Sequence, residues 1–184
     1  MNRIERLVWS MNSLEQFEAA AKSAAATVER VAYSAKPLAE AVARMSAGAK
    51  GVAVAAPLDL PEELFRGVRN LPGVVSGRSL NELSGAEVGV TEAFAGVART
   101  GSICVCVDHE FNGPISLLMR LHIAVLDAKR ICDTPSDLLR RDCIDGAGLR
   151  RNFVFVTGPS ATADMGPLVR GVHGPHRLHI LILV

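Results

Sequence analysis

The last quarter of the chain, residues 152–184, constrains the possible fold more than any other stretch. It contains two apolar runs, Phe153–Val156 and Leu178–Val184, each with the length and composition of a strand buried on both faces. Such strands are typical of a parallel sheet covered by helices. The polar segment between them is rich in glycine, proline, serine, threonine and histidine. In α/β proteins a loop of this kind often carries the ligand site, although its glycines and prolines can equally serve only to turn the chain.

The composition excludes several classes of partner. The chain has 184 residues, of which 49% are hydrophobic and 21% are charged, and its formal net charge is +1. These values fit one soluble, globular domain. A nearly neutral chain offers no electrostatic basis for binding nucleic acid or an anionic membrane. With one Tyr and one Trp, it also lacks the aromatic side chains that stack on single-stranded bases.

Two further observations predict a cytoplasmic location. No apolar run reaches the roughly 18 residues that a membrane span requires. The short N-terminal patch Leu7–Trp9 stops at polar residues and does not form the core of a signal peptide.

The cysteines predict neither a metal site nor a cluster in this chain. No two of them have the C-x-x-C spacing of zinc and iron–sulfur sites, since they stand at Cys104, Cys106, Cys132 and Cys143. We interpret them as small buried residues in a reducing compartment.

The order of the elements predicts one α/β domain over residues 13–184, after a loose lead-in at residues 1–12. Capping patterns predict helices that begin at Ser13, Ser34, Asp59 and Thr134, the last with Leu138, Leu139 and Ile144 on one side and its end near Gly146. Apolar and β-branched runs predict strands at Thr27–Tyr33, Val52–Ala55, Val74–Val75, Glu87–Val90, Ile103–Val107 and Leu121–Val125. Asp108–Pro114 is polar and contains glycine, so we expect a hairpin or loop there. The alternation favours a mostly parallel sheet with an antiparallel patch near residues 88–107.

Several motifs resemble those of one known family. The strings TGPSATAD, at residues 157–164, and GVHGP, at residues 171–175, resemble the C-terminal motif of the LUD-domain proteins, and of the lactate utilisation protein C group in particular. Thr91-Glu92-Ala93, Ala98–Ser102 and Leu121–Val125 are similar to further segments of that family.

The resemblance implies a fold and a role. The fold is a single three-layer α/β domain with a mostly parallel sheet, related to the NagB/RpiA/CoA-transferase-like fold. The implied role is that of an accessory subunit of a cytosolic iron–sulfur complex that oxidises L-lactate to pyruvate, with the clusters held by partner subunits and no cofactor in this chain. The alternatives are a stand-alone enzyme or a binding protein for a phosphorylated, carboxylate or CoA-linked small molecule, and a sensing or structural protein that has lost the chemistry.

The chain also departs from the family pattern. Arg99 stands where the family has an acidic residue, and Phe94 stands where an acidic or amide residue is usual. Met119 and Arg120 replace two prolines, Ala161 replaces the arginine of the TGPS-R-TAD string, and Gly166 replaces its trailing acidic residue. The fold tolerates these changes, whereas an activity that needs the arginine or the acid does not.

The TGPSATAD loop is the first candidate site. Ser160, Thr162 and Asp164, next to Gly158, are expected at the amino end of a short helix that follows a buried strand. Free backbone N–H groups and two hydroxyls there suit a small anionic ligand, a phosphate or a carboxylate. The alternative is that Ser160 or Thr162 only caps that helix.

Two further residues are candidates for catalysis. His173 lies between Gly171 and Gly174, where the backbone can approach a ligand and an imidazole can act as general acid or base. A histidine bonded to a carbonyl is the alternative. Glu92 is a speculative nucleophile, which the CoA-transferase relatives imply, or else a solvated loop residue.

The remaining polar groups support weaker hypotheses. Thr100-Gly101-Ser102 forms either a second wall of the same pocket or a simple turn. His122 and His179 are interpreted as core or edge histidines rather than ligands. No metal site is predicted at His173, His176 and His179, because Gly174-Pro175 interrupts their three-residue spacing.

Overall fold

A computed structural model describes residues 11–75, 79–108, 110–140, 152–164 and 166–184. Its centre is a six-stranded sheet in which every neighbouring pair of strands is parallel. The strand order across the sheet is β1 (Thr27–Val31), β12 (Arg177–Leu183), β7 (Leu121–Asp127), β4 (Val88–Ala93), β2 (Val52–Val54) and β3 (Val74–Val75). Side chains in β12, β7 and β4 are buried on both faces. The largely apolar sequences of β7 and β12 predict this, whereas β4 also buries the polar residues Thr91 and Glu92.

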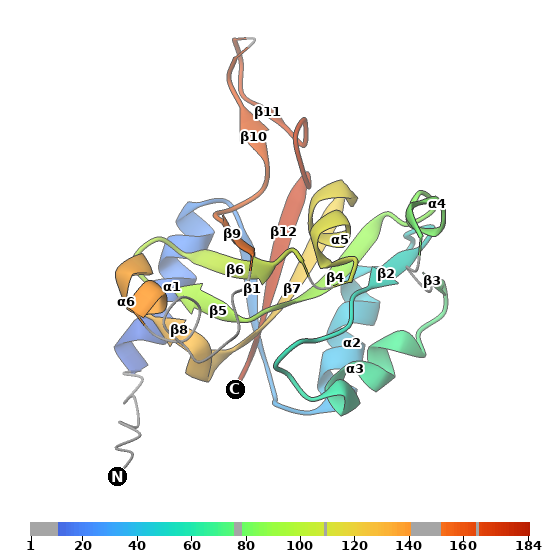
Figure 1. Ribbon diagram of the computed structural model, residues 1–184, viewed down its shortest axis with the longest axis horizontal. Coiled ribbons are helices and arrows are strands. Elements are labelled where there is room, and N and C mark those ends of the chain that lie inside the picture. Colours follow the sequence, from blue (N-terminus) through green and yellow to red (C-terminus); the bar gives the residue numbers. More distant parts are fainter. Residues whose placement is uncertain (1–10, 76–78, 109, 141–151, 165) are drawn as a thin grey trace.

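Two helices cover one face of this sheet (Figure 1). They are α2 (Ala35–Met45) and α3 (Glu62–Arg69), which contact each other along their length. Alternate residues of the strands point to this face, so Leu121, Ile123 and Val125 of β7 pack in one core with the apolar stripes of both helices.

A second, smaller sheet covers much of the other face. Its strand order is β8 (Ile131–Cys132), β5 (Ala95–Val97), β6 (Ser102–Cys106) and β9 (Phe153–Val156). Helix α1 (Met11–Ser23) packs between the two sheets through Phe17 and Ala21, against Ala124 and Leu126 of β7. The remaining helical segments of the described chain are α4 (Leu80–Leu83), α5 (Asn112–Leu118), α6 (Pro135–Arg140) and the 3-10 turn η1 (Ala128–Arg130).

The main sheet predictions are confirmed, and one is wrong. The mostly parallel central sheet is present, and β5 and β6 form the expected antiparallel patch. Phe153–Val156 does not join the parallel sheet: it becomes β9, which pairs antiparallel with β6. Val154 and Val156 of β9 pack toward the core between the sheets, Phe153 packs on the outer cluster around Phe94, and Phe155 is 43% exposed.

Two helix predictions also need correction. Ser13 lies inside α1 instead of capping it, and its hydroxyl donates a 2.6 Å hydrogen bond to Asp133. The predicted loop Asp108–Pro114 contains the start of α5, because a proline is tolerated in the first turn of a helix. The lead-in residues 1–10, Cys143, Ile144 and Gly146 lie outside the described residues.

A two-stranded arm replaces the short helix that we expected after Ser160. It consists of β10 (Ala161–Thr162) and β11 (Val169–Arg170), and it projects away from both sheets (Figure 1). Ala161 pairs with Arg170, so the backbone is extended where a helical turn was predicted. In the segments that the structure describes, no helix is long and apolar enough to cross a membrane.

Candidate functional site

The two glycine-rich motifs meet and form one structure. The Ser160 N–H donates to the carbonyl of Pro175 at 3.0 Å, and the Gly171 N–H donates to the carbonyl of Ser160 at 2.9 Å. Gly174 lies against Ser160 so closely that a Cβ at Gly174 would be 3.1 Å from the Ser160 Cβ. The backbone therefore holds both loops together at the base of the arm.

These loops line an open cavity of about 270 Å³. Four predicted site residues line it: Gly158, Ser160, His173 and Gly174. The other lining residues come from the two loops themselves and from α5, β7, β9 and the start of β12, and they are Ser116, Leu117, His122, Val154, Phe155, Val156, Thr157, Pro159, Pro175 and Leu178. Because His122 and Leu178 are the second residues of β7 and β12, the cavity lies at the amino ends of the parallel strands.

His122 is the buried polar group of this cavity. Its side chain is fully buried, and its Nε2 shares a 2.8 Å hydrogen bond with the Thr91 hydroxyl. Its Nδ1 has no hydrogen-bond partner within the described part of the chain. Burial lowers the pKa of His122 from 6.5 to about 4, so the imidazole is neutral at physiological pH. Our interpretation of His122 as a core histidine therefore missed a lining residue, for which the available signal was a polar residue inside an apolar strand.

The Thr100–Ser102 turn reaches the cavity through one lining residue. The hydroxyls of Thr100 and Ser102 are 2.7 Å apart, and the Ser102 hydroxyl is 2.7 Å from that of Thr157. Gly101 packs on the end of α1 with φ at +65°, where a Cβ would overlap the backbone of Ala21. Thr157 lines the cavity, whereas the three turn residues stand behind it.

Glu92 lies at the opposite end of the sheet. It is 3% exposed, near the carboxyl end of β4. Its carboxylate accepts hydrogen bonds from three consecutive backbone N–H groups, those of Leu58 at 2.5 Å, Asp59 at 2.9 Å and Leu60 at 3.1 Å. The carboxylate is thus held by the chain's own amides, and Glu92 is not brought together with His173.

The position of Glu92 explains why the carboxyl edge differs from that of many α/β proteins. The chain leaves β2 toward α3 on one face and leaves β4 toward β5 on the other, so a crevice between these neighbouring strands is expected. Ligands of such proteins commonly bind in that crevice. Here the Glu92 carboxylate at the end of β4 is hydrogen-bonded to residues 58–60, which belong to the connection from β2 to α3.

The remaining predicted residues lie outside the cavity wall. Thr162 and Asp164 are in the arm, where the Asp164 N–H donates to the Thr162 hydroxyl at 3.3 Å. Gly171 has φ at +78° and lies against the ring of His176. His179 is buried, and its Nδ1 is 2.6 Å from the Thr27 hydroxyl. Among the described residues, no three His, Cys, Asp or Glu side chains are grouped as metal ligands.

The fold and its motifs define an α/β protein with a predominantly parallel sheet, as the sequence predicted. A crystal structure of a DUF162 family protein from Deinococcus radiodurans has the same architecture, with a TM-score of 0.70 and 22% identity over 94% of this chain and 97% of that one. At this identity the likeness concerns the fold alone. Residues 75–183 match the model of the LUD domain, which is more than half of the chain. The chain therefore belongs to the LUD-domain family.

Curated relatives match over about half of the chain. A lactate utilization protein C from Bacillus subtilis is 31% identical over 94 residues, which are 49% of this chain and 39% of that protein. An uncharacterized electron transport protein from Escherichia coli is 30% identical over 104 residues, which are 53% of this chain and 20% of that protein. The chain thus spans less than half the length of these relatives.

Proposed function

We propose that this chain is an accessory subunit of a cytoplasmic iron–sulfur complex that oxidises L-lactate to pyruvate, and that its cavity binds the small carboxylate. The observation that carries the proposal is that TGPS and GVHGP, both within the LUD-domain match, converge on one cavity that contains a buried, neutral histidine. The name of the Bacillus subtilis relative supports lactate as the substrate class.

The size and donors of the cavity suit a small hydroxy acid. Its volume of about 270 Å³ is sufficient for a molecule of the size of lactate. In one neutral tautomer, His122 accepts a hydrogen bond from Thr91 at Nε2, and its buried Nδ1–H is left without a partner among the described residues. A carboxylate oxygen accepts from this Nδ1–H once the side chains that cover it move aside. The Ser160 hydroxyl and the His173 ring supply further hydrogen bonds.

Recognition of the carboxylate has to rely on these polar side chains, without a lysine or arginine. None of the described residues that line the cavity is lysine or arginine, and Ala161 stands where the family pattern has an arginine. Three polar side chains that converge on one carboxylate then provide the specificity, at lower affinity than an arginine would give.

In this proposal, partner subunits accept the electrons that lactate oxidation releases. Oxidation of L-lactate to pyruvate removes two electrons and two protons. We assign the electrons to iron–sulfur clusters in partner subunits, because the cysteines of this chain lack cluster spacing. The description of the Escherichia coli relative as an electron transport protein is consistent with this assignment.

The test is lactate-dependent dye reduction by the tagged chain isolated from its own host together with its partners. We expect activity in the complex and none in the chain alone. Replacing both Ser160 and His173 with alanine removes two ligand hydrogen bonds, which should raise the lactate concentration for half-maximal rate by roughly tenfold. Ser136→Ala is the matched control, because this exposed serine of α6 does not line the cavity.

Two results would contradict the proposal. If neither the complex nor the chain reduces the dye with lactate, the substrate assignment is wrong. If the chain alone is active, it is a stand-alone enzyme and not an accessory subunit.

A further inference from the structure

A second cavity, of about 340 Å³, lies on the other face of the central sheet. It too is at the amino ends of β4, β7 and β12, but it opens on the side of Val88 and Leu121, which pack with α2 and α3. Since Leu121 and His122 are successive residues of one strand, they point to opposite faces. This cavity is therefore separate from the one that His122 lines.

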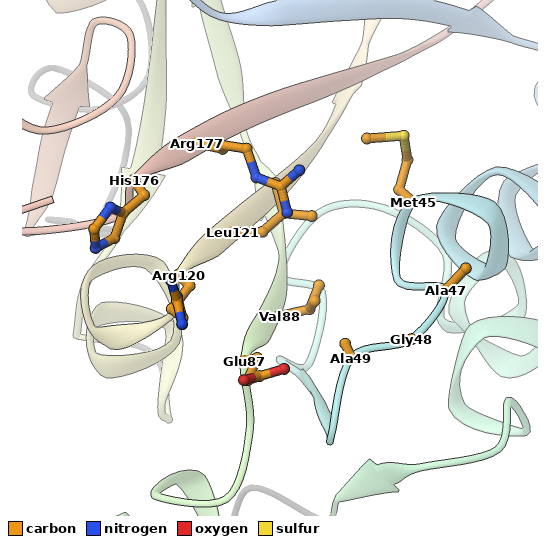
Figure 2. Close-up of a pocket in the computed structure, with 10 residues that line it drawn as sticks. All are labelled: Met45, Ala47, Gly48, Ala49, Glu87, Val88, Arg120, Leu121, His176 and Arg177. Carbon is orange, nitrogen blue, oxygen red and sulfur yellow. The ribbon is translucent and has the colours of Figure 1, made fainter. Parts of the chain in front are cut away.

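Two arginines dominate the wall of the second cavity. Arg120 directly precedes β7, and Arg177 is the first residue of β12. The Arg177 N–H donates to the Arg120 carbonyl at 3.1 Å, so the backbone keeps the two arginines side by side. Both residues are exposed, and neither guanidinium forms an ion pair with a residue that the structure describes. In Figure 2 both arginines and His176 lie on one side of the open space, and the loop Ala47–Ala49 lies on the other.

The other ionisable groups of the wall are fixed by the backbone. The ring of His176 rests against Gly171, where a Cβ would overlap it. Glu87 is the acidic residue among the described lining residues, and its carboxylate accepts a 3.0 Å hydrogen bond from the Lys50 N–H. Two guanidinium groups against one carboxylate leave the wall with an excess of positive charge.

We propose that this second cavity binds a phosphate group. Guanidinium groups present their N–H donors in a planar fork that matches the oxygens of phosphate, and two forks can contact different oxygens of one group. The His176 ring adds a further possible donor. Arg120 stands where the family pattern has proline. The pairing of Arg120 with Arg177 is therefore a feature of this chain that the family pattern does not include. The inference does not depend on the lactate proposal.

The experiment is a titration of the full chain with inorganic phosphate in a phosphate-free, low-salt buffer, followed by backbone amide NMR. We expect saturable shifts at residues 47–50, 120 and 177. Arg120→Gln and Arg177→Gln each remove a charge-assisted contact and should weaken binding by roughly tenfold or more. Glu87→Gln removes a like charge and should strengthen binding a few-fold.

Arg99→Gln is the matched control, because Arg99 is exposed and does not line this cavity, and the variant changes the net charge by the same amount. Phosphate binding by Arg99→Gln should equal that of the wild type. Thermal melts show whether each variant is folded. The inference is overturned if the wild type shows no saturable binding, or if Arg99→Gln weakens binding as much as Arg120→Gln does. Methyl phosphate, titrated in parallel, distinguishes an esterified phosphate from the free ion.

Discussion

Gly158→Ala is expected to destabilise the protein by about 3–5 kcal/mol, which places it among the most damaging single substitutions. Gly158 has φ at +73°, and an added Cβ would overlap the carbonyl oxygen of Ala24. The obstacle is backbone at the end of α1, so it cannot move aside by changing a rotamer. The loop would have to withdraw from α1 and would displace Ser160 from the cavity wall.

Gly73→Ala separates the steric contact from backbone strain. Gly73 has nearly the same φ, +79°, but nothing lies within 4 Å of an added Cβ. Its substitution should cost only the left-handed conformation, about 1–2 kcal/mol. Urea unfolding of both variants measures the difference in the free energy of unfolding. Equal losses for the two variants would show that Gly158 is not packed against α1.

The second large effect is a loss of stability in mild acid that is due to His122. The pKa of this side chain is 6.5 in an unfolded chain and about 4 in the native state, because it is fully buried. The unfolded chain therefore binds a proton before the native protein does. The stability that neutral His122 contributes is fully present above about pH 6.5 and is lost as the pH decreases toward 4. At pH 4 the loss amounts to about 3 kcal/mol.

A comparison with His122→Gln isolates this effect. Glutamine retains a hydrogen-bonding group for Thr91 but does not titrate, and the carboxylates contribute equally in both proteins. The free energy of unfolding, measured by urea denaturation from pH 7 to pH 4, should fall about 3 kcal/mol further in the wild type than in the variant. Parallel curves would contradict the burial of His122 as a neutral group. An NMR titration of the His122 ring in the wild type provides the same pKa directly.

The sequence was sufficient for the central sheet because β7 and β12 are largely apolar and β-branched, as is typical of strands buried on both faces. The sequence was insufficient for β9, since a four-residue apolar run occurs both in central strands and in half-exposed antiparallel strands. It also concealed α5, where Gly113-Pro114 has the composition of a turn. The arm was missed because the pairing of Ala161 with Arg170 is a non-local contact.

The candidate site was predictable to a similar extent. Loop composition and the motifs pointed to Gly158, Ser160, His173 and Gly174, which line one cavity, and also to Gly171, which does not line it. The role of His122 was not predicted, because its hydrogen-bond partner Thr91 is 31 residues away. No local sequence pattern reveals that the second ring nitrogen has no partner among the described residues. The environment of Glu92 could not be predicted for the same reason. The amides that bind its carboxylate belong to residues 58–60, in the connection between β2 and α3.

The first functional measurement should therefore test ligand binding at the cavity that His122 and Ser160 line, at the amino ends of the strands. We would record the imidazole ¹⁵N signals of the full chain during a titration with L-lactate, and with its uncharged methyl ester as a control. The account predicts that the Nδ1 signal of His122 shifts saturably with lactate and not with the ester, and that Ser160→Ala weakens the response. Unchanged His122 signals, or equal shifts with the ester, would contradict the claim that this cavity is a carboxylate site.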